Sequence, residues 1–356
     1  MGKTYVRAAA LTAWQNIAVS SGAGPNRISN ALGIGEERWN NPDERVDLAT
    51  YVKLSERIGE EANSTAASWA MGESYDLARL EDFGSAILSA TTLGGSLRRM
   101  ADLFALLQDA TEMRLVVQDG CAEMRYRILD PDIWPRHHDA MFTLGILAQL
   151  IRRASRDAWH KAEVVFEAKA QQMRCDLAQA VGTSVSFDGD ENVIRFPVAF
   201  LDLPVPVQPM PPCAQQGAGL KRAYRLLVEH QRRQGASDRV SNLIFSQLND
   251  GQINQERLAK EIGMSGRTLR RRLSQEGLSF QDVLDDCRMR QAALEFRTRP
   301  SASIAQIALR LGYSEHSTFT RAFQRWSGVS PQTFRNQTYP TSAATNQRPE
   351  TQCPNY

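Results

Sequence analysis

The sequence of 356 residues lacks the patterns that mark most enzymes and metalloproteins. It has no H-E-x-x-H segment, no nucleophile elbow and no glycine-rich loop of the kind that cradles phosphate. Its five cysteines are scattered, without a C-x-x-C pair or a Cys/His spacing that suits zinc. We therefore expect a protein that is not an enzyme, has no cofactor or metal ion, and keeps free thiols in a reducing cytoplasm.

Long hydrophobic runs are absent as well. The longest largely apolar segment, residues 140–151, is too short to cross a bilayer about 30 Å thick as a helix. The first residues show no signal-peptide pattern. The sequence therefore predicts a cytoplasmic protein without a membrane partner, and its 42% hydrophobic residues suffice for the cores of two domains.

Charge is distributed unevenly along the chain. Residues 1–219 hold 21 Lys and Arg against 28 Asp and Glu, a net charge of −7, whereas residues 220–337 hold 20 against 11, a net charge of +9. A basic region joined to an acidic one favours a polyanionic partner for the basic part. Chance variation of a solvated surface is the alternative interpretation.

The first two hundred residues mix helix and strand signals. MRLVVQ and CAEMRYRIL flank Asp119-Gly120, and the second arm alternates apolar and polar residues, which is typical of a β-hairpin. AEVVFEA predicts a further strand, and SVSF and VIRF, either side of DGDEN, predict a second hairpin. Helices are expected from Pro42, with acidic residues in the first turn, over about residues 137–153, and over KAQQMRCDLAQAVG. The fold class expected here is α+β, with helices on a small, mostly antiparallel sheet.

A cluster of prolines marks the domain boundary. Five of them between Pro204 and Pro212 forbid a regular helix or a central strand. LKRAYRLLVEHQRRQG then predicts a connecting helix, and the residues that follow give helix signals with short turns and no strand signal. The predicted organisation is an α+β domain over 1–203, a Pro-rich linker and connecting helix over 204–236, an all-α domain over 237–337 and a disordered tail over 338–356.

The all-α region contains an internal repeat. LAKEIGMSGRTLRRRLSQEG matches IALRLGYSEHSTFTRAFQRWSG, and each copy has the order expected of a helix-turn-helix. A small residue lets two helices approach, a glycine ends the first helix in a left-handed cap, and a serine caps the second. An apolar pair four residues apart then anchors the second helix and leaves its other face free for a DNA groove. The corresponding residues are Ala259, Gly263, Ser265, Leu269 and Leu273 in the first copy and Ala308, Gly312, Ser314, Phe319 and Phe323 in the second.

This region resembles the AraC/XylS family of bacterial transcription regulators over about residues 237–337. The resemblance rests on LAKEIGMSGRTLRRRL, on the linker helix with Arg288 and Ala292, and on IAQIALRLGYSEHSTFTRAFQRWSGVSPQTFR. Less specific motifs over about residues 20–205 (TTL, AW…VVF and the SVSF…IRF…FLDLP run) resemble the "arabinose-binding"-type sensor domain of one branch of that family. The resemblance implies that residues 1–203 sense a ligand and form a dimer, while two helix-turn-helix motifs joined by a linker helix bind DNA.

Two sets of side chains follow from this resemblance as DNA contacts. In the first recognition helix, Arg267 and Arg270 are expected to contact base edges, and Arg271 is expected to contact phosphate or both phosphate and base edges. Arginine can make either contact, because it can bridge guanine O6 and N7 or bind phosphate. Two further arginines have different expectations: Arg272 is either a phosphate contact or inert, and Arg288 braces the two motifs. The first helix also offers Ser265 and Thr268, and the second offers His316, Ser317, Thr318, Thr320 and Arg321.

The sensor domain gives weaker residue-level expectations. Trp69, Trp134, Trp159 and Phe166 are weak candidates for ligand binding, although buried aromatics usually belong to a core. The resemblance implies a small-molecule effector, RNA polymerase as a protein partner, a homodimer, and an activator of transcription. The effector's identity, the operator and the sign of regulation stay open.

Two alternatives to an effector-responsive regulator remain at this point. One is a regulator without a small-molecule effector, controlled by a protein partner or by its own abundance. The other is a DNA-repair enzyme fused to an AraC-like module, which would need a metal-bound or activated acceptor cysteine. Cys121 lies at the predicted hairpin and Cys175 on a predicted helix, with no cluster of ligating residues beside either in the sequence.

Overall fold

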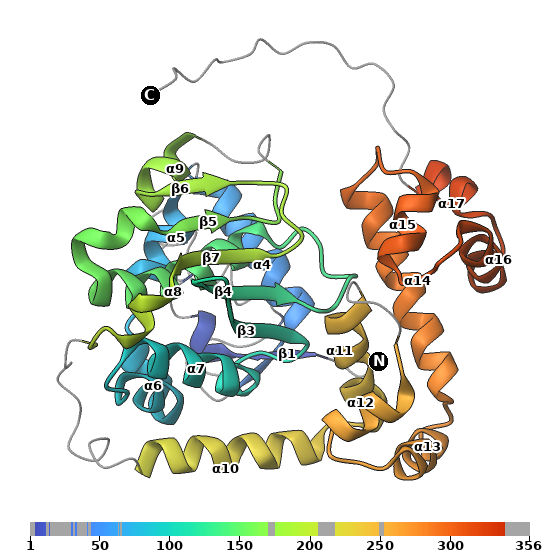
Figure 1. Ribbon diagram of the computed structural model, residues 1–356, viewed down its shortest axis with the longest axis horizontal. Helices are drawn as coiled ribbons and strands as arrows, with labels where there is room; N and C mark the ends of the chain where they lie inside the picture. Colours follow the sequence, from blue (N-terminus) through green and yellow to red (C-terminus); the bar gives the residue numbers. More distant parts are fainter. Residues whose placement is uncertain are drawn as a thin grey trace. The chain divides into compact units, whose positions relative to one another are not determined.

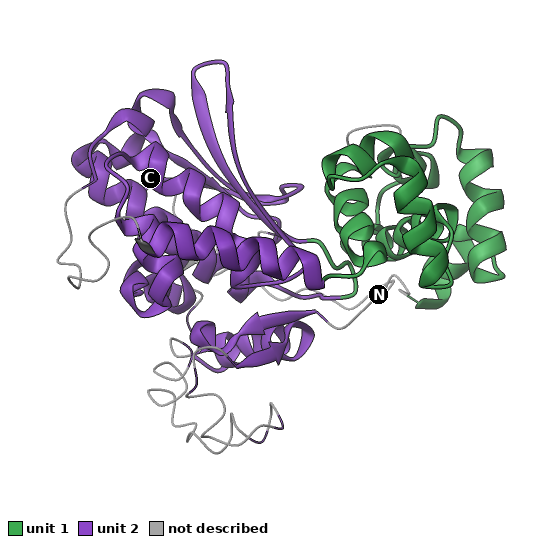
Figure 2. Ribbon diagram, turned by 90° about the horizontal axis from the view of Figure 1, so that it is seen from below, with its two compact units in different colours: residues 1–2, 129–132, 234–356 green, residues 3–128, 133–233 purple. Residues whose placement is uncertain are grey.

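The computed structural model describes residues 4–11, 14, 30, 33, 41, 44–62, 64, 66–169, 175–205, 218–248 and 253–338. These residues form two compact units, shown in different colours in Figure 2. The mixed unit lies within residues 3–128 and 133–233, and the helical unit combines residues 129–132 with the chain from 234 onward. No helix of the described residues is long and apolar enough to cross a membrane.

A five-stranded sheet organises the mixed unit (Figure 1). Its first two strands form the predicted hairpin, with Asp119 at φ 51° and Gly120 at φ 79° in the turn. Along the second arm Ala122, Met124 and Tyr126 are buried, as the alternation predicted. All neighbouring strands are antiparallel except for the pair β5 and β6. The strand order is β3 (Thr111–Gln118), β4 (Cys121–Ile128), β7 (Asn192–Pro197), β5 (Glu163–Val165) and β6 (Ser184–Ser186).

The second predicted hairpin is wrong. SVSF and VIRF do contain β6 and β7, but these strands do not pair with each other, because β5 lies between them. Val164 of β5 is fully buried and pairs with Val185 on one side and Ile194 on the other. The turn residues between β6 and β7 gave a local hairpin signal, whereas the pairing is decided by a strand that lies some twenty residues earlier.

Helices cover this sheet, and the predicted helix over 137–153 is confirmed as α8 (His137–Ser155). The helix expected from Pro42 begins later, at Leu48, because Arg45–Asp47 forms strand β2 and pairs with β1 (Tyr5–Arg7). Asp47 caps that helix by accepting from the Thr50 amide at 2.9 Å. The other helices are α4 (Leu48–Glu61), α5 (Ala66–Glu73), α6 (Glu81–Leu88), α7 (Leu93–Leu103), α9 (Cys175–Val181) and α10 (Ala218–Arg233), with 3-10 turns η1 (Ala8–Ala10), η2 (Leu77–Leu80), η3 (Phe104–Leu106), η4 (Arg156–Lys161) and η6 (Val198–Asp202).

The helix predicted to connect the domains, α10, packs within the mixed unit. Its Ala223 and Leu227 are buried, and Tyr224 donates a hydrogen bond to Asp102 of α7 at 2.9 Å. The two units divide after Arg233. Most of residues 1–40, the Pro-rich stretch 206–217 and the tail 339–356 lie outside the described residues, and so do the predictions that concern them.

In the helical unit the described residues form helices and turns without a strand. Two hydrophobic cores hold it together, one around Leu269 and Leu273 and one around Phe319 and Phe323. The central helix α14 contributes Cys287 to the first core and Phe296 to the second. The helices are α11 (Ala236–Gln247), α12 (Gln255–Glu261), α13 (Gly266–Gln275), α14 (Phe280–Thr298), α15 (Ile304–Arg310), α16 (His316–Ser327) and α17 (Pro331–Thr338).

Candidate DNA-binding surface

The turn between α12 and α13 has the geometry that the repeat predicted. Gly263 adopts φ 74°, and its amide donates to the Lys260 carbonyl at 3.0 Å. The Met264 amide donates to the Ala259 carbonyl at 2.8 Å, which completes a Schellman motif at the end of α12. Ala259 is fully buried, so the helices meet closely at this point.

The second copy repeats this turn between α15 and α16. Gly312 adopts φ 78° and donates to the Leu309 carbonyl, while the Tyr313 amide donates to the Ala308 carbonyl, both at 3.0 Å. Ala308 is 1% exposed. The same backbone hydrogen bonds at corresponding positions confirm two helix-turn-helix motifs in tandem.

Helix α13 presents three arginines on one face. Its first turn is capped by Ser265, whose hydroxyl accepts from the Thr268 amide at 3.1 Å. Leu269 and Leu273 have no exposed surface and fix the opposite face of the helix in the first core. The exposed arginines 267, 270 and 271 therefore point away from the core together.

Arg272 is exposed but lies on a different side of α13. At about 100° per residue it is roughly 140° around the helix from Arg267. Burial, and then the charge of Arg272, lower the pKa of Arg239 on α11, so these two side chains lie near each other. Arg272 therefore stands apart from the face of Arg267, Arg270 and Arg271.

Arg270 is only weakly held by its neighbours. Its Nε lies 3.4 Å from the Gly266 carbonyl oxygen, and its guanidinium lies 3.9 Å from a carboxylate oxygen of Glu256. The Arg270 and Glu256 side chains are 66% and 63% exposed. An ion pair with this much exposure to solvent contributes little to stability. The guanidinium can therefore leave this pair for an anionic partner at small cost.

Helix α16 begins one residue later than the repeat predicted. Its N-cap is Glu315, without a side-chain hydrogen bond to the backbone, so the prediction that Ser314 caps this helix is wrong. The second copy has one extra residue between the turn and the buried Phe319, and this moves the start of the helix past Ser314. The cap that stabilises the first recognition helix therefore has no counterpart in the second.

The predicted contacts of α16 do not all share one face. Ser317, Thr318 and Arg321 are exposed, as is His316 at the first turn. Thr320 is half-buried, and its hydroxyl donates to the His316 carbonyl at 2.9 Å, so this hydroxyl is used within the helix. Thr320 is thus less available to DNA than its neighbours are.

Two exposed polar residues extend these faces and were not predicted. Gln324 follows Ser317 and Arg321 at helical spacing, and Ser274 follows Arg267 and Arg270 in the same way. Both are exposed. The helical period alone would have identified them, because each lies seven residues after the first residue of its face.

Arg288 of the linker helix α14 lies against the second motif. Its guanidinium carbon is 4.6 Å from the centre of the Tyr313 ring, a cation–π geometry. Arg325 on α16 also contacts this helix, through an ion pair with Asp285 at 2.8 Å. These contacts tie α16 and the turn before it to α14.

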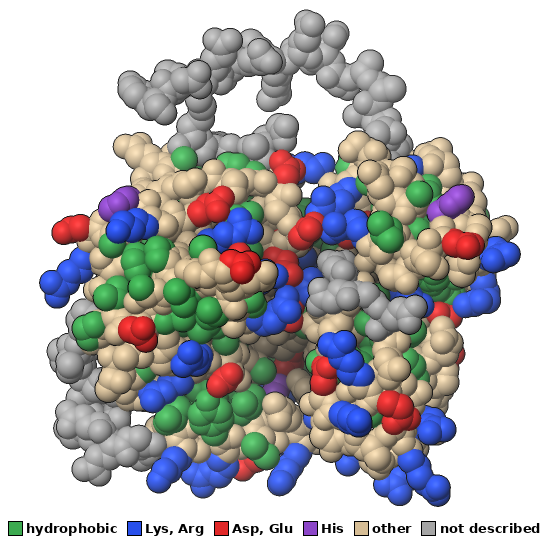
Figure 3. Space-filling model, in the orientation of Figure 1, with side chains coloured by type: hydrophobic (Ala, Val, Ile, Leu, Met, Phe, Trp, Pro, Cys, Tyr) green, Lys and Arg blue, Asp and Glu red, His purple; other side chains and the backbone are tan. Residues whose placement is uncertain are grey.

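Basic side chains gather around the first recognition helix. On the face drawn in Figure 3, Lys and Arg side chains cluster over the part of the helical unit that holds α13.

Among the described residues, no three His, Cys, Asp or Glu side chains come together as a possible metal site.

The four aromatic residues considered for ligand binding lie in the mixed unit. Trp69, Trp159 and Phe166 are buried in its core, where Trp69 and Phe166 meet edge to face at 6.3 Å. Trp159 donates from its indole nitrogen to the Val181 carbonyl at 2.9 Å. Trp134 is half-buried and packs against His137, with ring centres 4.9 Å apart.

Comparison with known families agrees with this geometry. Residues 22–205 match the family described as the arabinose-binding domain of AraC transcription regulator, N-term. Residues 258–337 match a helix-turn-helix domain. The chain belongs to the AraC family of transcription regulators. An AraC-family protein of this kind regulates transcription by binding DNA through its helix-turn-helix domain and is not an enzyme.

Individual relatives of this AraC-family chain are bacterial regulators. The ornithine utilization regulator of Pseudomonas aeruginosa is 26% identical over 321 residues, which cover 88% of this chain and 91% of that protein. The regulator VirS of Mycobacterium tuberculosis is 40% identical over 99 residues, 28% of this chain and 29% of VirS. The crystal structure of the regulator CdpR from Pseudomonas aeruginosa aligns with 92% of this chain and 98% of its own, at 21% identity and a TM-score of 0.41.

Proposed function

We propose that this regulator reads a specific promoter sequence through α13, with Arg267 and Arg270 on base edges and Arg271 on phosphate or on both. The observation that carries this proposal is the exposed row of arginines on a helix that two buried leucines hold from behind. A bidentate contact of arginine to guanine discriminates against the wrong base by about 1–3 kcal/mol. Ser265 and Thr268, at the start of the same helix, are suited to phosphate.

The second recognition helix is proposed to position the protein and to add short polar contacts. Ser317, Thr318 and Arg321 are exposed on α16, and His316 lies at its N-terminal end. Thr320 remains in this proposed set as a weaker contact, because its hydroxyl already donates within the helix. The lower charge of this face supports a smaller share of base recognition than α13 has.

The mixed unit is proposed to respond to a small-molecule effector and so to change how the protein binds DNA or contacts RNA polymerase. Its match to a ligand-binding type of domain supports this role. A relative that covers most of this chain is named for ornithine utilization, which makes small metabolites the first compounds to try. We further propose a cytoplasmic homodimer that activates transcription. Coupling between effector and DNA is typically about 1–3 kcal/mol.

Selection of DNA from a random-sequence library by the full-length protein tests the central part of this proposal. The expected result is an enriched motif with guanines in two elements about one helical turn apart, because two recognition helices on one face of DNA reach successive major grooves. A library that stays unenriched after repeated rounds, with and without cell extract as a source of effector, would contradict sequence-specific recognition.

The proposed sign of regulation needs a separate experiment. The selected sequence is placed upstream of a weak promoter that drives a reporter gene in a bacterial host. Expression of the full-length protein should raise reporter output, and removal of the selected sequence should abolish the rise. Reduced output would mean that the protein represses from this position.

A further inference from the structure

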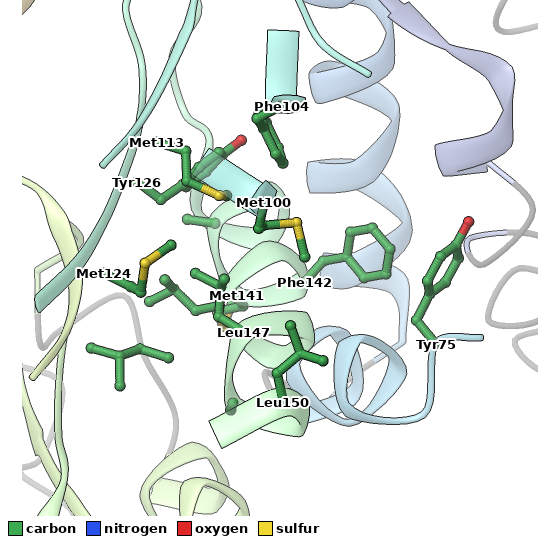
Figure 4. Packing of buried hydrophobic residues seen from close by; sticks show 14 of the residues in the cluster. Tyr75, Met100, Phe104, Met113, Met124, Tyr126, Met141, Phe142, Leu147 and Leu150 are labelled. Carbon is green, nitrogen blue, oxygen red and sulfur yellow. The ribbon is translucent and has the colours of Figure 1, made fainter. Parts of the chain in front are cut away.

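The mixed unit contains a cavity that the DNA-binding role does not use. It lies between α4, α6, α7, α8 and strand β1. Its volume, counted as the space that the centre of a water molecule can occupy, is about 40 Å³. Since one water needs roughly 10–15 Å³ on such a measure, the space suits a few waters or a small organic molecule. Figure 4 shows Met100, Phe104 and Phe142 converging here. None of the four aromatic residues considered from the sequence lines this cavity.

One carboxylate stands in this mostly apolar wall. Asp139, in the first turn of α8, is 1% exposed. The Tyr126 hydroxyl donates to it at 2.6 Å, and the Tyr51 hydroxyl donates to it as well. Each tyrosine oxygen accepts in turn, from Gln108 at 3.0 Å and from Trp14 at 3.1 Å. Two hydrogen-bond chains therefore end on the same buried acid.

The charge of Asp139 is poorly compensated within the protein. The cation that acts on it is Arg136, but Arg136 is bound by both carboxylate oxygens of Glu167, at 3.0 and 2.7 Å. Burial is the main cause that raises the pKa of Asp139 to about 6, above its usual value near 4. A carboxylate kept in an apolar cavity at such a cost is suited to a ligand that brings its own positive charge.

The aromatic lining suits the same kind of ligand. The lining residues Tyr75 and Phe142 meet edge to face, with ring centres 5.6 Å apart. The ring centre of Phe104, a third lining residue, is 5.7 Å from that of Tyr126, which donates to Asp139. Rings around a small cavity attract an ammonium group through their faces while they also accept an alkyl chain. Arg7 of β1 is the cation among the lining residues, and it is half-exposed.

We propose that this cavity is the effector site and that it binds a small alkylamine, with the ammonium on Asp139 and the alkyl chain against Met100, Phe104 and Phe142. The proposal rests on the proposed function in that the mixed unit is taken as the sensing unit. It specifies which residues hold the effector and which chemical group they recognise.

Binding of n-butylamine, n-butanol and n-butyrate to the full-length protein tests this site by calorimetry and thermal shift. Phosphate buffer replaces Tris, because Tris is itself a primary amine. The amine should bind and the isosteric alcohol and carboxylate should bind at least about tenfold more weakly, since a charged hydrogen bond is lost or a like charge is introduced. This comparison uses the wild-type protein and does not depend on how a variant folds.

Two variants then locate the bound amine. Asp139→Asn should weaken amine binding by about tenfold or more, whereas Asp102→Asn, an exposed acid of α7 in the same unit, should leave it unchanged. Equal binding of the three compounds, or undiminished amine binding by a folded Asp139→Asn protein, would overturn the proposal. Enrichment of a DNA motif is read separately, so failure of the amine site leaves the proposed DNA recognition standing.

Discussion

Glu56 is a buried residue that should make the stability of the mixed unit depend on pH. It lies on α4, where a carboxylate oxygen accepts from the His138 amide at 2.6 Å. Hydrogen bonds from the backbone of His138 and Asp139 lower the pKa of Glu56, but burial raises it by more, to about 8. The folded protein therefore holds Glu56 largely protonated at pH 7. In the unfolded chain the same group ionises near pH 4.5.

The stability of the wild type should therefore fall with rising pH relative to a Glu56→Gln variant. The contribution of Glu56 is complete below pH 4.5 and is lost as the pH rises through about 8, because the unfolded state releases the proton first. The difference in free energy of unfolding should change by at most about 1.4 kcal/mol per pH unit and level off above pH 8. Urea unfolding between pH 6 and 9 measures it.

Glu61→Gln is the matched control for this prediction, since Glu61 is exposed on the same helix, whereas the charge of Glu60 itself raises the pKa of Glu56. Its unfolding free energy should track that of the wild type across the range. If the Glu56→Gln and wild-type curves also stay parallel, Glu56 is already ionised in the folded protein and the argument fails.

The backbone conformation of Gly263 leads to a second prediction for a single residue. Its φ of 74° is unfavourable for side chains, but a Cβ there would meet no atom within 4 Å. Gly263→Ala should therefore lower the local stability of α12 and α13 by about 1 kcal/mol through backbone strain alone. Gly263→Asn should cost less, because asparagine tolerates this conformation. Hydrogen exchange of the α12 and α13 amides measures both, and equal protection in all three proteins would refute the strain argument.

At the scale of elements, α14 joins the two helix-turn-helix motifs, and Arg288 makes one of its contacts with the second one. The guanidinium over Tyr313 should contribute about 0.5–1 kcal/mol. Arg288→Ala should therefore lower the protection of α15 and α16 against hydrogen exchange, and Arg288→Lys should retain part of the contact. DNA affinity at fixed salt should change little.

The opposite result would assign Arg288 to DNA. In that case Arg288→Ala would leave hydrogen exchange unchanged, weaken DNA binding, and reduce the dependence of binding on salt by the equivalent of one phosphate contact, about 0.9 in the logarithmic slope.

The sequence predicted the helical unit better than the mixed unit because its signals are local. Gly263, Ser265 and the pair Leu269 and Leu273 lie within eleven residues of one another, and each acts on its own turn or helix. The start of α16 was misplaced because a single extra residue separates Gly312 from Phe319 relative to the first copy.

Long-range pairing limited the predictions for the mixed unit. The pairing of β5 with both β6 and β7, and that of β1 with β2, join residues too far apart for a turn signal to report. The cavity around Asp139 is assembled from seven or more segments, so no spacing in the sequence could indicate it. Aromatic residues alone pointed to Trp69, Trp134, Trp159 and Phe166, and three of these, Trp69, Trp159 and Phe166, are core residues.

On the scale of the whole molecule, charge and fold divide in the same way. Most of the net acidic stretch 1–219 falls in the mixed unit, apart from residues 129–132, and most of the net basic stretch 220–337 falls in the helical unit. DNA binding should therefore weaken steeply with salt, whatever the sequence bound, because several phosphates are neutralised together. Specificity, by contrast, is assigned to a few side chains on α13.

The most direct test of that assignment is fluorescence anisotropy with the DNA sequence recovered by selection. The wild type, Arg270→Ala and Arg272→Ala are titrated against the selected and a scrambled duplex at several salt concentrations. Arg272 is the matched control, an exposed arginine of the same helix on another side.

Arg270→Ala should lose about 1–3 kcal/mol of preference for the selected duplex, with a salt slope close to that of the wild type. Arg272→Ala should keep the preference. If Arg270→Ala discriminates between the two duplexes as well as the wild type does, α13 is a non-specific cationic surface at this position and the central claim is wrong.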